Sequence, residues 1–97
     1  MWEKARIRKI MKIPEAIYDL ENLLGNYLDY EIVNLYEIET KDKIYEIIIP
    51  QDLGDLREGE EVELSIKRRY LIFREATIRK GEIEKRGEVL GVYSKRG

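Results

Sequence analysis

Short segments in which apolar and polar residues alternate follow one another along most of this chain. The clearest is "GEEVELSIK", residues 59–67, where Val62, Leu64 and Ile66 share one parity and mostly charged residues take the other. Because side chains alternate between the two faces of a β-strand, this spacing predicts a strand with one buried face. Comparable apolar-rich segments that predict strands occur at residues 4–13, 26–40, 44–50, 69–80 and 88–95.

These strands are short, and turn residues separate them at regular intervals. Residues 41–43, "KDK", predict a tight turn that joins two strands in a hairpin, and Pro50 is expected to end the second of them. Lys9 and Ile10 break the alternation of the first strand, which predicts a bulge or twist there. A single small β-barrel domain over residues 1–97, five- to six-stranded and OB-like, is the expected fold. An open α+β sheet is the alternative.

One segment has helical rather than strand periodicity. In "PEAIYDLENLLGN" Pro14 and Glu15 suit a helix N-terminus and Gly25 suits a C-terminal cap. The apolar residues between them recur at helical spacing, which predicts one short helix near the N-terminus, over residues 15–24.

The composition excludes several kinds of chemistry. The chain has no His and no Cys, so the usual general base and thiolate metal ligands are missing. It also has no phosphate-binding loop, dinucleotide glycine motif or nucleophile elbow. We therefore expect a protein that is not an enzyme and has no cofactor, catalytic residue or metal site. Acidic pairs such as Asp52 with Asp55, or Glu60 with Glu61, could hold a hard cation or act in catalysis, but solvated loop acids are the expected interpretation.

Charged residues make up 39% of the chain, whereas Asn and Gln are few, a pattern typical of heat-adapted proteins. It indicates a hyperthermophilic, archaeal source. No apolar run reaches the length of a membrane span, and the basic start lacks the apolar region of a secretory signal. Cytoplasmic localisation is the expectation.

Charge is segregated along the sequence. Residues 1–12 carry a net charge of +4, residues 15–63 carry −12 and residues 67–80 carry +5, although the whole chain has a formal charge of −2. If the two basic segments lie together in the barrel, they form a positive face that suits a polyanion. If they lie beside the acidic segments instead, the charges pair across the sheet and no such face exists.

The first arrangement predicts a nucleic-acid-binding face. Its residues would be the following basic side chains and one tyrosine: Arg6, Arg8, Lys67, Arg68, Arg69, Tyr70, Arg74 and Arg79. Tyr70 and Trp2 each lie at a strand start beside charge, where an exposed ring could stack on a base of single-stranded nucleic acid. Phosphate contacts by the cations would dominate the affinity for DNA or RNA.

The stretch "YEIIIPQDLGDLREGEEVELSIKRR", residues 45–69, joins an aliphatic strand, a loop in which one helical turn is expected at Leu53 and Leu56, and an alternating strand. A later strand contains "RGEVLGVYSK", residues 86–95. This order resembles OB-fold-type small barrels of transcription and translation proteins, and more narrowly the eighth-subunit family of RNA polymerases in its archaeal form. The resemblance implies a barrel that docks on the largest polymerase subunit and does no chemistry.

Two functions are therefore expected. The first is non-enzymatic, non-specific binding of DNA or RNA through the basic face. The second is a structural role, in which the chain binds a protein partner in a larger assembly such as archaeal RNA polymerase. Neither involves a membrane.

Overall fold

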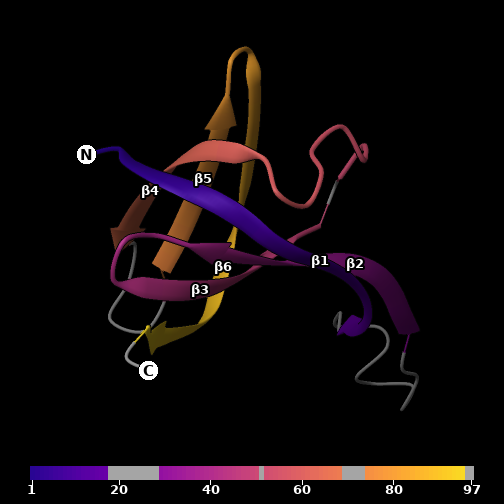
Figure 1. Ribbon diagram of the computed structural model, residues 1–97. Helices are drawn as coiled ribbons and strands as arrows, with labels where there is room; N and C mark the ends of the chain where they lie inside the picture. The colour runs from indigo at the N-terminus through magenta and orange to yellow at the C-terminus, as the bar shows by residue number, and fades with distance from the viewer. Residues whose placement is uncertain (18–28, 51, 69–73, 96–97) are drawn as a thin grey trace.

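The computed structural model describes residues 1–17, 29–50, 52–68 and 74–95. In this part of the chain all regular structure is β, and six strands form a closed antiparallel barrel (Figure 1). The strands are β1 (Glu3–Ile17), β2 (Asp29–Glu39), β3 (Lys43–Ile49), β4 (Glu61–Arg68), β5 (Arg74–Lys80) and β6 (Ile83–Ser94). The predicted small β-barrel is confirmed. None of the described residues belongs to a helix that is long and apolar enough to cross a membrane.

The strand order around the barrel is β1-β2-β3-β6-β5-β4, and β4 closes the ring by pairing with β1. Two meanders, β1-β2-β3 and β4-β5-β6, are thus joined along two junctions, β3 with β6 and β1 with β4. The β1–β4 junction pairs the segment Glu3–Arg6 with Glu61–Leu64, whereas β1 pairs with β2 from Arg6 to Ile17.

Residues of one parity on each strand fill the barrel interior. Ile7, Tyr36, Ile38, Ile47 and Ile78 are fully buried there. Leu56, from the loop between β3 and β4, adds to the same core although it belongs to no strand. The loop therefore packs its apolar side chain onto the barrel, and burial of such a side chain contributes roughly 1.5–3 kcal/mol.

β1 and β2 continue together beyond the barrel as a two-stranded arm, which Figure 1 shows leaving the other strands. A second apolar cluster lies on the opposite face of β2, where Val33 and Leu35 pack with Ile48 of β3 and with Met11 and Ile13 of β1. Both faces of β2 therefore carry apolar side chains. Tyr36 and Ile38 face the barrel interior, and Val33 and Leu35 belong to the outer cluster.

The local features of the strands agree with the sequence pattern. The β1–β2 register shifts between Ile7 and Lys9, which confirms the predicted bulge. Thr40 and Lys43 close the β2–β3 hairpin by a 2.8 Å backbone hydrogen bond, and β3 ends just before Pro50. The loop from β3 to β4 contains no helical turn among its described residues, 52–60.

The predicted helix over residues 15–24 is wrong where it can be compared. Residues 15–17 form the last part of β1 and pair with Asp29–Glu31 of β2. The rest of that prediction lies outside the described residues. Pro14 is compatible with this strand because β4 pairs only with Glu3–Arg6 of the described part of β1, so the second edge at Pro14 needs no ladder donor.

The C-terminal region also differs from the sequence pattern. Residues 83–94 form one strand, β6, rather than a short segment followed by a strand from residue 88. Gly87 lies within this strand, opposite Ala76, and a Cβ built on it would overlap the carbonyl oxygen of Ile48 in β3. Gly87 therefore does not form a turn. Its missing side chain allows β6 to approach β3 closely.

Candidate nucleic-acid interface

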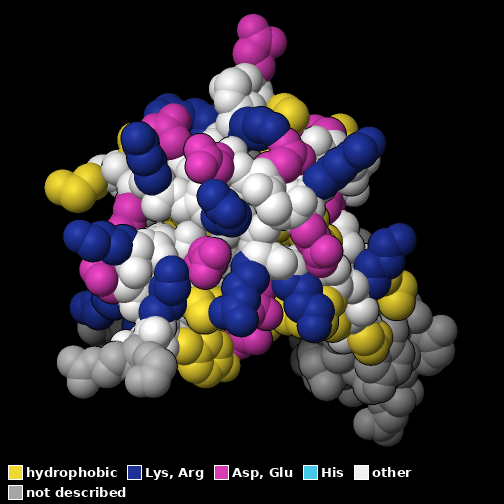
Figure 2. Space-filling view, in the orientation of Figure 1, with side chains coloured by type: hydrophobic (Ala, Val, Ile, Leu, Met, Phe, Trp, Pro, Cys, Tyr) yellow, Lys and Arg dark blue, Asp and Glu magenta, His cyan; other side chains and the backbone are white. Residues whose placement is uncertain are grey.

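The first basic segment falls on β1. The described residues of the second fall on the end of β4 and on β5, and both β1 and β5 are neighbours of β4. They are close but not adjacent, because β4 lies between them and presents Glu61 and Glu63 to solvent. The face between β1 and β5 is therefore of mixed charge. Figure 2 shows Lys and Arg interspersed with Asp and Glu over the side of the molecule that it presents.

Three of the predicted interface residues form ion pairs with carboxylates. The Arg6 guanidinium lies 3.4 Å from Glu61, Arg79 lies 3.2 Å from Glu63, and Arg8 lies 3.5 Å from Glu37 of β2. All three arginine side chains are more than one-third exposed. Such surface pairs typically contribute less than about 1 kcal/mol. The charges thus compensate one another across strands without being locked in place.

Arg6 and Arg79 nevertheless line one depression, which spans β4 and has a volume of about 560 Å³. We call it the basic depression. Its charged lining consists of Lys4, Arg6, Arg79, Lys80, Lys95, Glu39, Glu61 and Glu63. Cations from β1, β5 and the C-terminal segment therefore converge here, and they outnumber the lining carboxylates.

The other end of β4 and β5 carries a second group of cations, Lys67, Arg68 and Arg74, which we call the strand-end trio. Arg68 lies directly opposite Arg74 in the β4–β5 register, and all three residues are exposed. Like charges directly opposite each other in a sheet are destabilising. None of the three forms an ion pair with the described residues. Lys67 lies opposite Glu75 in the same register, so the like-charged pair of the trio is Arg68 with Arg74.

An aromatic ring lies beside the basic depression. The guanidinium carbon of Arg79 is 3.8 Å from the centroid of the Trp2 ring, and Trp2 remains 37% exposed. A cation over an indole face is a favourable cation–π arrangement. The expected exposure of Trp2 is confirmed. Arg69 and Tyr70, also predicted for the interface, lie outside the described residues.

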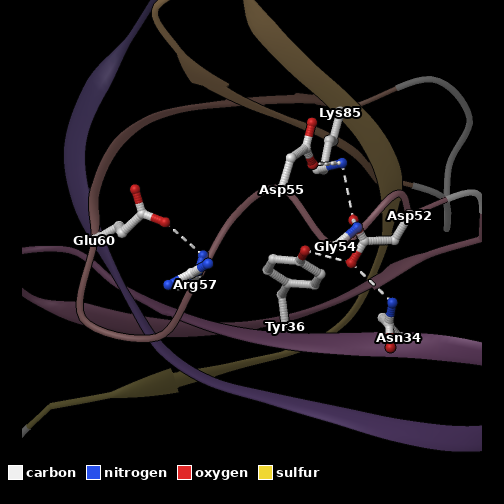
Figure 3. A network of polar contacts seen from close by, with 8 residues as sticks. All are labelled: Asn34, Tyr36, Asp52, Gly54, Asp55, Arg57, Glu60 and Lys85. Carbon is white, nitrogen blue, oxygen red and sulfur yellow. Dashed lines mark hydrogen bonds and ion pairs between the residues drawn. The ribbon is translucent and has the colours of Figure 1, made fainter.

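A buried polar cluster, which the sequence did not predict, lies under the loop between β3 and β4 (Figure 3). Lys85 points inward from β6, and its Nζ lies 2.8 Å from Asp52 and 2.5 Å from Asp55. The Asp52 carboxylate also accepts hydrogen bonds from the Tyr36 hydroxyl at 2.5 Å and from Asn34 Nδ2 at 2.8 Å. The Asp52 and Lys85 side chains are only 2% and 6% exposed.

The interactions in this cluster set the protonation states of its members. Burial alone would raise the pKa of Asp52, but hydrogen bonds from Lys85, Tyr36 and the Gly54 N–H hold that pKa below 3.8. Burial alone would lower the pKa of Lys85, but its two aspartate partners raise that pKa above 10.5. Burial and the hydrogen bond to Asp52 raise the pKa of Tyr36 well above 10.0.

At neutral pH the cluster therefore holds one ionised Asp52, one charged Lys85 and one neutral Tyr36. None of these groups has a pKa near neutrality, where a general acid or base works best. The cluster fastens the loop to β2 and β6 instead. It also changes the interpretation of Asp52, which was expected to be a solvated loop acid. No group of three or more carboxylates in the described part of the chain is arranged to hold a metal ion.

The sequence contained one signal of this cluster, the inward parity of Lys85 between Ile83 and Gly87. A lysine on the apolar face of a strand needs a buried carboxylate partner. Here that partner comes from a loop that lies beside β6 only in the closed barrel.

Comparisons of the chain with protein-family models, with curated proteins and with solved structures gave no match.

Proposed function

We propose that this chain binds nucleic acid, without catalysing a reaction, through the strand-end trio and the basic depression. The phosphate backbone would run along the outer face of β4 and β5 past Arg6, Arg79 and Lys67. It would turn over the strand ends to reach Arg68 and Arg74, which share the parity of the core residues Ile66 and Ala76. Along the strands the two groups are separated by four to seven residues, roughly 13–23 Å. A few nucleotides would be long enough to contact both.

The observation that carries this proposal is Arg68 opposite Arg74. Placing two arginines directly opposite each other, with no ion pair to a described carboxylate, costs folding free energy, and a bound phosphate would remove that cost. A protein that needed only stability would gain by placing Glu at one of the two positions. An anionic ligand gives the arrangement a purpose.

The ion pairs in the basic depression do not prevent binding. Arg6 and Arg79 are held by exposed glutamates, and such pairs are worth at most about 1 kcal/mol. A phosphate can therefore replace either carboxylate, or share the guanidinium with it, at small cost. Glu61 and Glu63 would weaken the affinity without abolishing it, and they would favour a weak, exchangeable complex.

Fluorescence anisotropy with a labelled oligonucleotide at about 50 mM salt tests the proposal, because phosphate contacts are strongest at low salt. The variant Arg68→Glu/Arg74→Glu should lose most of the affinity. The slope of log Kd against log salt should fall by about 0.9 for each phosphate that the variant no longer neutralises.

The matched control is Lys12→Glu/Lys41→Glu, which changes the net charge equally. Lys12 and Lys41 are exposed, belong to neither cation group and form no ion pair with described residues. The control should retain most of the affinity. Absence of binding by the unmodified chain to any DNA or RNA would refute the proposal, as would equal losses in both variants.

A second candidate function, docking on a protein partner, is favoured by the β1–β2 arm. Beyond Arg6, β1 has no second strand partner within the described residues, and β2 pairs with β3 only from Asn34 onward. Ile32 on this arm is 64% exposed. A partner could add a strand to either edge and cover Ile32. This candidate includes the hypothesis of an OB-like polymerase subunit.

Co-purification from native lysate distinguishes the two functions. A stoichiometric protein partner that is absent with Ile32→Lys but kept with Leu90→Lys, a matched exposed position on β6, would support docking through the arm. If such a partner is found and the chain has no affinity for nucleic acid, protein docking replaces nucleic-acid binding as the proposed function.

A further inference from the structure

Trp2 and Arg79 form a contact that phosphate binding alone does not require. One face of the Arg79 guanidinium lies 3.8 Å from the centroid of the indole, and one edge of the guanidinium lies 3.2 Å from Glu63. Arg79 also lines the basic depression. A flat, partly exposed aromatic and cationic surface is thus fixed beside a group of phosphate-binding candidates.

Such a surface has a particular use in nucleic-acid recognition. Aromatic rings and guanidinium planes stack on unpaired bases, and this contact tolerates any base because every base has a π-face. In a duplex the bases are already stacked on one another, so only phosphates and groove edges are offered to the protein. A stacking surface beside cations therefore favours a strand whose bases are unpaired.

We infer that Trp2 and Arg79 form a stacking platform for one unpaired base, so that the basic depression takes single-stranded nucleic acid in preference to duplex. This inference rests on the proposed function and adds the kind of nucleic acid that is bound. Arg79 would then contribute in two ways, through its charge to a phosphate and through its plane to the Trp2 platform. Glu63 contacts only one edge of the guanidinium, at 3.2 Å, so it leaves the face toward Trp2 unaffected.

The chain provides its own reporter for this contact, because Trp2 is its only tryptophan. Stacking of a base on the indole should quench the tryptophan emission. The ligand to use is an oligo-dT strand, and the matched ligand is an abasic strand of the same length, which has the same phosphates and no bases. The unmodified chain should bind oligo-dT more tightly than either the abasic strand or a duplex, and only oligo-dT should quench the emission.

Two variants separate stacking from charge. Trp2→Ala should weaken oligo-dT binding about tenfold, a typical loss for one stacked base, and leave the affinity for the abasic strand unchanged. Trp2→Phe, which keeps an aromatic ring, should recover part of the loss. Circular dichroism and the thermal midpoint of each variant establish that the barrel is intact.

The outcomes distinguish this inference from the proposed function. If oligo-dT, abasic strand and duplex bind equally and the emission does not change, the stacking platform is refuted and phosphate-based binding stands. Tighter binding of the duplex also refutes it. If no nucleic acid binds at all, both the platform and the proposed function are refuted.

Discussion

Lys85 of β6 and Asp52 of the β3–β4 loop form an ion pair of 2.8 Å in which both side chains are almost completely buried. Tyr36, on β2, donates a hydrogen bond to the same carboxylate from the other side. β2 and β6 are the two neighbours of β3 in the barrel. Asp52 thus connects the β3–β4 loop to β2 and β6 at once.

Replacing Lys85 with Met should lower the free energy of unfolding by about 3 kcal/mol, because an ionised Asp52 would remain buried without its cation. The measurement is urea denaturation at neutral pH. The matched control is Lys95→Met, since Lys95 pairs with Glu39 at 3.4 Å but is 36% exposed. Its loss should not exceed about 1 kcal/mol. An equal decrease in the free energy of unfolding of the two variants would show that the buried pair contributes no more than the exposed one.

Stability should fall in acid through Asp52. Its pKa is lower in the folded chain than the ordinary 3.8, so its contribution is complete above that value and is lost as pH falls through the folded pKa. The difference in unfolding free energy between the unmodified chain and Asp52→Asn should therefore shrink below about pH 4. A difference that stays constant down to about pH 2 would contradict this linkage.

The same linkage has the opposite direction in base. The pKa values of Tyr36 and Lys85 are raised in the folded chain, so their contributions are complete below 10.0 and 10.5 and are lost at higher pH. Tyr36→Phe should therefore flatten the alkaline fall in stability. An unchanged alkaline slope in this variant would argue against a buried, neutral phenol.

Replacing Gly87 with Ala should destabilise the barrel by roughly 3 kcal/mol or more, because the new methyl group overlaps the Ile48 carbonyl in β3. Gly91→Ala is the matched control on the same strand. Its Cβ would meet the Glu46 carboxylate oxygen at 2.9 Å, and that flexible side chain can move. The thermal midpoints of the two variants should differ clearly. Equal midpoints would mean that β3 and β6 can move apart at Gly87 without loss of stability.

Neutralising the carboxylates on β4 should strengthen nucleic-acid binding. In Glu61→Gln/Glu63→Gln, Arg6 and Arg79 lose their competing partners, and the affinity should rise about two- to fivefold, the equivalent of one exposed ion pair. Asp42→Asn/Glu88→Gln makes the same change in net charge outside the basic depression. An equal gain in this control would mean that overall charge, and not the local pairs, sets the affinity.

Patterns carried by neighbouring residues predicted the fold well. The alternation at Val62, Leu64 and Ile66, the turn at residues 41–43 and the stop at Pro50 are all present in the barrel. These features depend on local backbone preferences that a sequence displays directly. The bulge beside Lys9 belongs with them, because a break in parity is visible without knowledge of the partner strand.

Features that depend on distant partners were not predictable in the same way. Helical spacing after Pro14 competed with strand pairing, and residues 15–17 took the strand because Asp29–Glu31 lie beside them. The acidic partners of Arg6 and Arg79 became known only when the strand order placed β4 between β1 and β5. Asp52 and Lys85 are far apart in sequence, so only the closed barrel reveals their contact.

The junction of Glu3–Arg6 with Glu61–Leu64 is the shortest strand-to-strand register of the barrel as described. Loss of this short β1–β4 pairing would open the barrel into a sheet, while the strand pairs within the two meanders would remain. Trp2 immediately precedes this segment and contacts Arg79 of β5, so a ligand bound to the indole would stabilise the closed barrel. Ligand binding at Trp2 and the pairing of β1 with β4 would then be linked thermodynamically. Slower amide hydrogen exchange in β1 would indicate that the ligand is bound.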